Sequence, residues 1–224
     1  MGDRWAVWRG DVGDGALHRH FAAQAVLADQ PVRVFDQDAQ IFEARCVLID
    51  PLTPHRIEPG TQALLIYLEP GARLDPAADE LLRPVRKGSP CAMLRSAANA
   101  FWEKWLAQAD PPAPVLDARL SAALDAIDRE LFSGPMQLGA VAARTTLSAD
   151  RFRHLFAEQI GLPFRRYLLW RRLRLAAIEI MAGRDATNAA HAAGFADAAH
   201  FARTLKSTFG VTASQALLVR RTES

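Results

Sequence analysis

The sequence is poor in cysteine, and it has neither a membrane-length apolar run nor a leader pattern. Cys46 and Cys91 are its two cysteines, too few for a disulfide scaffold and not spaced as a CxxC pair or a metal knuckle. No uninterrupted apolar stretch approaches the roughly 18 residues of a membrane helix. The N-terminal residues Met-Gly-Asp-Arg-Trp are polar and lack the basic-then-apolar order of a signal peptide. We therefore expect a protein of the reducing cytoplasm with no membrane partner.

Charge is distributed unevenly along the 224 residues. Half of the residues are apolar and 23% are charged, which is typical of a globular protein of one large or two small domains. Residues 1–110 hold 12 Lys and Arg against 15 Asp and Glu, whereas residues 111–224 hold 15 against 10. An acidic front half and a basic back half favour a back half that meets a polyanion, the alternative being a merely solvated basic face.

Prolines divide the chain. Three of them in Asp110–Pro114 exclude a helix interior there, so this segment is interpreted as the main linker. Residues 1–72 hold short Val-, Ile-, Leu- and Phe-rich runs between turn signals, which predicts a small β-barrel or sandwich. Two of the predicted strands, Ala25–Ala28 and Val32–Phe35, are separated by the turn signal Asp29-Gln-Pro31. Residues 73–110 predict a helical connector. Its amphipathic helix, Met93–Ala107, would pack on the barrel or form a dimer contact.

Residues 111–224 have a helical pattern throughout and contain an internal repeat. Short helices are predicted at Leu138–Arg144 and Thr187–Ala193, each followed by a second helix, and a long helix at Phe164–Ala182 joins the two pairs. A shift of 48 residues aligns Val141-Ala142 with Ala189-Ala190, and a shift of 49 aligns Phe152 with Phe201. A last helix is predicted at Thr212–Val219. The two units span about 137–160 and 186–209.

The repeated unit has the features of a helix-turn-helix. Two helices that cross over a short turn need small residues where their backbones approach, and Ala142 and Ala190 supply them. The turn favours a residue at positive φ, for which Gly194 is better suited than Thr146. In such units the second helix enters the DNA major groove, and a helix between two units could place both on one duplex face.

These residues resemble the AraC family of bacterial transcription regulators. The matching stretches are Leu147-Ser148…Phe152-Arg-His-Leu-Phe156…Gly161, then Tyr167…Arg172…Ala176, and Gly194-Phe195-Ala-Asp197-Ala-Ala-His200-Phe201-Ala-Arg203-Thr-Leu-Lys206…Phe209-Gly210. The resemblance covers roughly the last half of the chain. It implies a DNA-binding domain of two helix-turn-helix units bridged by a long helix, and an N-terminal barrel that senses an effector.

Several positions depart from the family pattern. Ala189 stands where the family usually has Ile or Leu, and Leu205 where it has Phe. Ala213 stands in place of Pro, and Ala216-Leu217 in place of Tyr-Arg. These smaller residues predict a looser second unit. In the first unit, His154 stands where the family usually has Arg.

The outward faces of the two recognition helices supply the predicted DNA contacts. The base-contacting candidates are Asp150, Arg153, His154, His200 and Arg203. An arginine there can pair with guanine O6 and N7, and Asp150 can accept from cytosine N4. Arg151, Arg172 and Lys206 are expected to meet phosphates.

The front half contains a histidine pattern that resembles a cupin metal site. His18 and His20 are two apart, Gln24 follows where the cupin pattern has an acidic ligand, and His55 follows a proline-rich turn. Imidazoles suit Zn, Ni, Cu or Fe, so a divalent transition metal is the expected cofactor, if the site holds one. The alternative is a remnant barrel whose histidines hydrogen-bond in a ligand cleft.

The sequence therefore predicts an α+β protein, a small cupin-like β-barrel or sandwich followed by an all-α double helix-turn-helix domain. The predicted function is a DNA-binding transcription regulator whose N-terminal domain senses a small molecule or a metal, with double-stranded DNA as partner. The sequence leaves open whether the chain forms a homodimer. It has no catalytic residues. The alternatives are a metal-dependent cupin enzyme with a helical appendage, and an interaction module that has lost DNA binding.

Overall fold

The computed structural model describes residues 5–12, 16–69, 76–96, 100–107, 116–131, 134 and 136–209. The chain divides into two compact units, residues 1–113 together with 205–224, and residues 114–204. The predicted linker Asp110–Pro114 and the predicted helix Thr212–Val219 lie outside the described residues. Among the described helices, none combines the length and the apolar character that a membrane crossing requires.

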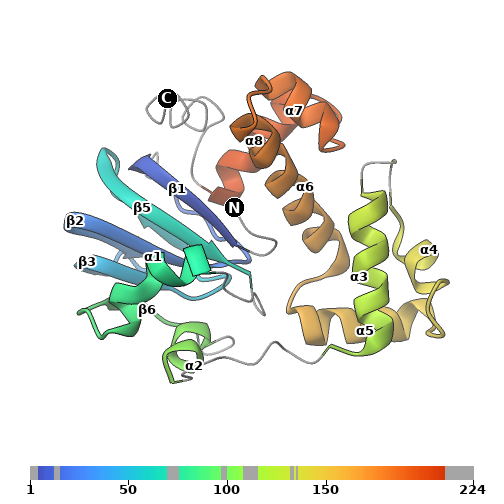
Figure 1. Cartoon of the computed structure of the whole chain (residues 1–224), viewed down its shortest axis with the longest axis horizontal. Coiled ribbons are helices and arrows are strands. Elements are labelled where there is room, and N and C mark those ends of the chain that lie inside the picture. The colour runs from blue at the N-terminus through green and yellow to red at the C-terminus, as the bar shows by residue number, and fades with distance from the viewer. Residues whose placement is uncertain are drawn as a thin grey trace. The chain divides into compact units, whose positions relative to one another are not determined.

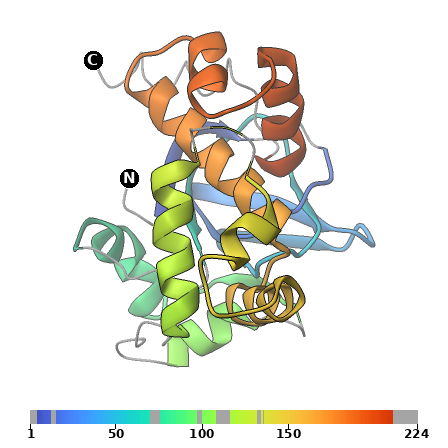
Figure 2. The same cartoon turned by 90° about the vertical axis from the view of Figure 1, so that its right-hand side faces the viewer.

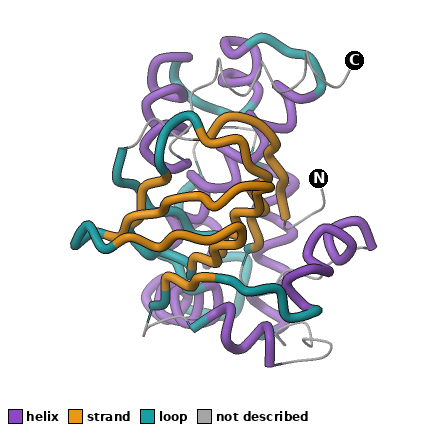
Figure 3. The backbone as a smooth tube through the Cα atoms, turned by 90° about the vertical axis from the view of Figure 1, so that its left-hand side faces the viewer, coloured by secondary structure: helices purple, strands orange, loops and turns teal. Residues whose placement is uncertain are grey.

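The N-terminal unit is built on one mixed sheet (Figures 1 and 3). Its strands are β1 (Trp5–Val12), β2 (Ala23–Asp36), β3 (Ile41–Ile49), β4 (His55–Ile57), β5 (Thr61–Leu68) and β6 (Ala92–Leu94). The strand order is β1-β5-β2-β3-β6, and β4 pairs with β2. All pairs are antiparallel except β3 with β6. The predicted β-rich front half is confirmed.

One long strand replaces two predicted ones. The sequence predicts a break at Asp29-Gln-Pro31, yet β2 continues through it, with an irregular register against β3 between Leu27 and Val32. Proline cannot donate to a ladder, and a bulge is one of the few places where a strand tolerates it. The proline therefore marks a bulge rather than a turn.

The helix predicted over Met93–Ala107 is wrong for its first half. Ala92–Leu94 pairs with β3 as strand β6, and α2 spans only Phe101–Ala107. The buried Asp50 carboxylate sets this boundary, because it accepts hydrogen bonds from Ser96 N (2.8 Å) and Trp102 N (3.0 Å). These bonds tie the chain to the end of β3 ahead of α2 and again in the first turn of α2.

Two helices, α1 (Pro76–Arg86) and α2, cover one face of the sheet (Figure 1). The core between them and the sheet includes Leu48, Ile66, Leu82, Trp102 and Trp105. The apolar stripe of α2 is thus buried against the sheet of its own chain. Of the two alternatives that the sequence left open, packing on the barrel or a dimer contact, this is the first. On the same face, Cys46 and Cys91 form a disulfide, which the cysteine count did not suggest.

The C-terminal half is helical, as predicted (Figures 1 and 2). Its helices are α3 (Ala118–Glu130), α4 (Leu138–Ala142), α5 (Ala149–Ile160), α6 (Phe164–Met181), α7 (Ala186–Ala192) and α8 (Ala198–Phe209). The pairs α4–α5 and α7–α8 are the two repeated units, and α6 runs from one pair to the other (Figure 2). At 1.5 Å per residue, α6 is about 27 Å long.

Side-chain caps mark where the two recognition helices begin, and a glycine marks where α5 ends. The Ser148 hydroxyl accepts from Arg151 N at 3.2 Å at the start of α5, as expected of an N-cap. Asp197 caps α8 through His200 N at 2.6 Å. Gly161 ends α5 in the left-handed conformation with φ of 79°.

The two turns differ in backbone conformation. Gly194 has φ of 74°, as predicted for the second turn. The corresponding expectation for Thr146 is wrong, because its φ is not positive. The first turn instead uses hydrogen bonds from Thr145, whose hydroxyl donates to the Ala142 carbonyl at 2.7 Å. In the first turn, a side-chain hydrogen bond thus takes the place of the left-handed residue that the second turn uses.

Candidate functional site

Buried aromatic residues orient both recognition helices. In the first unit Phe152 and Phe156 are fully buried and contact Phe164, whose ring centroid lies 6.2 Å and 5.4 Å from theirs. In the second unit Phe201 is fully buried and its ring lies 5.3 Å from that of Phe195. Because one face of each helix is held in the core, the opposite face must be exposed.

The exposed face of α5 carries the residues predicted for the first unit. Asp150, Arg151, Arg153 and His154 are all exposed. Arg153 Nη1 lies 2.7 Å from Asp150 Oδ1, and their side chains are 58% and 71% exposed. The His154 Nδ1 atom lies 2.9 Å from the Asp150 carbonyl oxygen. Asp150 therefore organises both neighbours on this surface.

The exposed face of α8 carries the residues predicted for the second unit. His200, Arg203 and Lys206 are exposed. The His200 backbone N–H, together with the nearby charge of Arg203, lowers the pKa of the Asp197 carboxyl. Ala198, Ala199 and Ala202 fill the rest of the face with methyl groups.

Arg172 occupies a different position from the other predicted phosphate contacts. It lies on α6 and is half-buried. A Cβ atom at Gly194 would lie 3.5 Å from Arg172 Nε, so the guanidinium packs under the turn of the second unit. Its Nη2 donates to the Gly134 carbonyl at 3.4 Å, a residue that precedes the first unit. Arg172 thus contacts chain segments next to both units.

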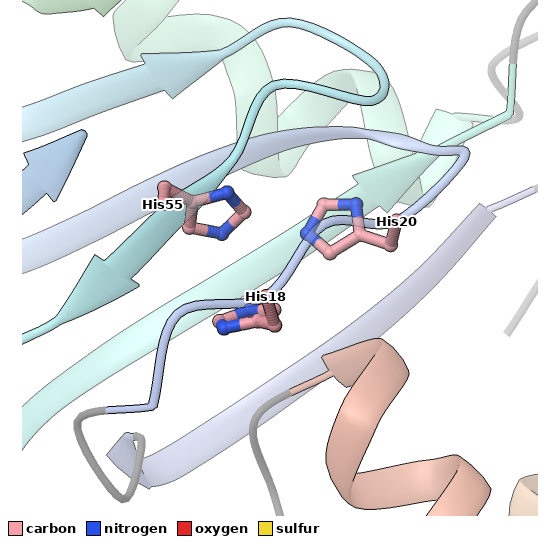
Figure 4. Close-up of side chains that lie close together, drawn as sticks. All are labelled: His18, His20 and His55. Atoms are coloured by element: carbon pink, nitrogen blue, oxygen red, sulfur yellow. The ribbon is translucent and has the colours of Figure 1, made fainter. Parts of the chain in front are cut away.

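The predicted histidines meet in one cluster (Figure 4). His18 and His55 are paired by reciprocal backbone hydrogen bonds of 2.9 Å, and His20 lies two residues further along. One ring nitrogen from each histidine lies within 4.8 Å of those of the other two. All three side chains are buried.

Backbone carbonyls orient the three rings. The Nδ1 atoms of His18, His20 and His55 lie 3.0, 2.8 and 2.9 Å from the carbonyl oxygens of Ala16, Ala22 and Thr53. A carbonyl only accepts, so in their neutral forms His18 and His55 carry the hydrogen on Nδ1 and present a lone pair at Nε2. His20 has an acceptor at both ring nitrogens, because Gln24 Oε1 lies 3.1 Å from its Nε2. The His55 Nε2 atom is buried and has no hydrogen-bond partner within the described residues. This is the arrangement in which histidines ligate a metal.

Burial favours the neutral form of two of the three histidines. Loss of hydration, with the neighbouring His18, lowers the pKa of His20 from 6.5 to about 4. The same causes, with His20 added, lower the pKa of His55 well below its ordinary value. Unprotonated rings are the form that binds metal ions.

Gln24 joins the cluster, together with a residue that the sequence did not reveal. The Gln24 amide is fully buried, with Oε1 3.1 Å from His20 Nε2. Its Nε2 donates to the Tyr67 hydroxyl at 3.2 Å, and burial raises the pKa of Tyr67. Gln24 and Tyr67 are opposite each other across β2 and β5. Only this strand register, which spacing does not specify, could have identified Tyr67.

Comparisons with known proteins agree with this geometry. Residues 141–218 match the family model described as "Helix-turn-helix domain". The structure is similar to that of ToxT from Vibrio cholerae O395, with a TM-score of 0.59 and 13% identity over 96% of this chain and 97% of that one. A transcriptional regulator with an AraC-type DNA-binding domain from Chromobacterium violaceum matches at 20% identity over 47% of this chain and 95% of that one, with a TM-score of 0.44. No curated protein matches the sequence.

The class of the protein follows from the family match and the geometry of the repeated units. Residues 141–218 in the C-terminal part of the chain are a helix-turn-helix domain. The fold of the chain is similar to that of ToxT. The helical part, which the alternative of a cupin enzyme left unexplained, is accounted for by this domain match.

Proposed function

We propose that this regulator reads DNA with two recognition helices, α5 and α8, and that its N-terminal unit adjusts this binding in response to a small molecule or a transition metal in the cytoplasm. The observation that carries the proposal is the repeat itself. Two equivalent helices each bury a phenylalanine and expose a basic residue, and α6 joins the two units.

The base contacts in the first unit are assigned to Asp150, Arg153 and His154. Arg153 rests on Asp150 in the free protein. An ion pair this exposed contributes about 0–1 kcal/mol, so Arg153 can exchange it for guanine O6 and N7 at little cost. Asp150 is then released to accept from cytosine N4, and His154 stays beside it.

The second unit reads DNA through His200 and Arg203. The three alanines on this face, of which Ala199 is exposed, can contact thymine methyl groups but supply no hydrogen bonds. Arg151 and Lys206 are assigned to phosphates, which position the protein without reading sequence. Arg172 is assigned to a phosphate as well, through the part of its guanidinium that the turn at Gly194 does not cover.

The first experiment compares substitutions of different predicted roles on DNA selected from genomic fragments. Arg153→Ala should weaken binding to the selected site by about 1–3 kcal/mol and relax its preference at one base pair. Lys206→Ala should weaken binding to all DNA sequences alike. It should also reduce the salt dependence of binding by about one released counterion.

Arg45→Ala, an exposed arginine on β3, is the charge-matched control and should leave the binding curve in place. If Arg153→Ala and Lys206→Ala also leave the curve unchanged, the assigned faces are wrong.

In the N-terminal unit, the donor set of His18, His20, His55 and Gln24 fits a transition metal. These donors are neutral, and the cluster that the described residues form contains no carboxylate. Imidazole donors favour Zn²⁺, Ni²⁺ or Cu²⁺ over Mg²⁺ and Ca²⁺, which prefer oxygen ligands. A metal there would link the segment before β2 to the start of β4.

A small organic molecule is the other candidate effector. A structure of ToxT is described as bound to (E)-4-(8-methylnaphthalen-1-yl)but-3-enoic acid. The likeness to this chain is one of fold, at 11% identity. We propose the same general use of the N-terminal unit here, with a ligand whose identity is open.

Metal titration separates the two kinds of effector. Zn²⁺ or Ni²⁺ should bind at one ion per chain and raise the melting temperature, whereas Mg²⁺ should not. The double variant His18→Ala, His55→Ala should lose this response, and His191→Ala, an exposed histidine on α7, should keep it. Binding that survives in the double variant would exclude the cluster as the metal site.

A further inference from the structure

The Cys46–Cys91 disulfide joins two segments that are already held together without it. Beginning one residue after each cysteine, β3 and β6 pair in parallel, with Val47 opposite Ala92 and Ile49 opposite Leu94. Further along, Asp50 N donates to the Leu94 carbonyl at 3.0 Å, and the Asp50 carboxylate accepts from Ser96 N and Trp102 N. Breaking the disulfide therefore leaves the two thiols as neighbours.

The bond is open to solvent from one side. Cys46 is buried, whereas Cys91 is half-exposed at the end of the segment that follows α1. Cys46, Ser89 and Pro90 also line a groove of about 860 Å³, whose other walls include Leu27, Leu64 and Val85. A small thiol can therefore approach Cys91 Sγ without unfolding of the sheet.

We propose that Cys46 and Cys91 form a reversible thiol–disulfide modification site for low-molecular-weight thiols and disulfides. The inference rests on the proposed function in one respect. A regulator bound to chromosomal DNA works among reducing thiols, where disulfides in proteins are usually transient or redox-sensing.

The chemistry is a balanced exchange. A glutathione thiolate attacks Cys91 Sγ, the Cys46–Cys91 bond breaks, and Cys46 leaves as a thiolate that takes up a proton. A second glutathione thiolate then attacks the mixed disulfide, releasing Cys91 as a thiol and glutathione disulfide as the oxidised product. Oxidation by glutathione disulfide runs through the same steps in reverse.

The consequence of reduction is local. Ser89 and Pro90, within the segment from Lys87 to Cys91, form part of one wall of the groove, and the disulfide fastens the end of this segment to β3. Its backbone bonds to α1 run from Lys87 N, Gly88 N and Ser89 N to the carbonyls of Arg83, Val85 and Pro84, at 2.9, 3.2 and 3.1 Å. The reduced form should loosen this wall while the Asp50 contacts keep β6 and α2 in place.

The test equilibrates the full-length protein in glutathione buffers of varied ratio and traps free thiols with N-ethylmaleimide for mass spectrometry. The expected result is a full and reversible passage from no label to two labels per chain, at an intermediate buffer ratio, with the melting transition retained in both forms. Tryptic cleavage after the exposed Lys87 should be several-fold faster in the reduced form. In the double variant Cys46→Ser, Cys91→Ser this cleavage should not respond to glutathione.

Three results would each overturn the proposal. They are a bond that persists in fully reduced glutathione, thiols that never pair in glutathione disulfide, and a reduced form without a cooperative melting transition. None of these readouts uses DNA. DNA binding is measured separately on the same samples, so a failure of the DNA-binding proposal is distinguishable from a failure of this one.

Discussion

His20 and His55 are the residues at which burial and protonation compete most directly. The unfolded chain binds a proton near pH 6.5, whereas the folded protein holds the pKa of His20 at about 4. Between these pH values the unfolded state binds more protons than the folded state. The contribution of His20 to the free energy of unfolding is therefore fully present above about pH 6.5 and is lost as the pH drops toward 4. This loss in the free energy of unfolding amounts to roughly 3 kcal/mol for His20 alone, and the lowered pKa of His55 acts in the same direction.

Urea unfolding of the metal-free protein at about pH 7 and about pH 5 measures this loss. We expect the double variant His20→Asn, His55→Asn to be less stable at neutral pH but much less dependent on pH. His200→Asn, which replaces an exposed histidine, is the matched control and should keep the parent's slope. If the free energy of unfolding of the double variant changes with pH as much as that of the parent, other groups cause the acid sensitivity.

The predictability of individual residues depended on how local their partners are. His18 and His20 share a segment, so their spacing predicted a common direction, and the pattern around His55 completed the set. Tyr67 and the Cys46–Cys91 pair belong to distant parts of the chain, and only strand register brings them to their partners. Spacing along the sequence contains no such information.

At the scale of the elements, the two turns of the repeat provide a paired test. Gly194→Ala should destabilise the second unit by about 1–2 kcal/mol, because an L residue with a side chain is strained at a φ of 74°. The added methyl would meet Arg172 at an ordinary contact distance of 3.5 Å, so the strain comes from the backbone and not from crowding.

Thr146→Ala is the companion substitution at the equivalent position, and it should cost much less because the φ of Thr146 is not positive. Chemical denaturation of the full chain, with hydrogen exchange to localise the loss, compares the two. Equal losses at both positions would contradict the assigned difference between the turns.

The helices were more predictable than the strands for a physical reason. Helix periodicity, the Ser148 cap and the Gly161 stop are local signals, and the structure places α5 between them. The division of β2 was mispredicted because a bulge and a turn share the same local residues. The helix over Met93–Ala107 was mispredicted because Asp50, far along the chain, claims the backbone N–H groups at its start.

At the scale of the whole molecule, α6 joins the two helix-turn-helix units that we propose bind DNA together. Arg171 on α6 pairs with Asp128 on α3 at 2.6 Å, and Arg172 packs under the turn at Gly194. A bridging helix of about 27 Å held in this way fits recognition helices in successive major-groove segments about 34 Å apart.

Hydroxyl-radical and methylation footprinting on a selected site tests this central claim most directly. The account predicts two protected major-groove segments about one helical turn apart on one duplex face. Arg153→Ala should remove protection from one segment, and Arg203→Ala from the other. A single protected segment, or the same loss from both substitutions, would contradict it.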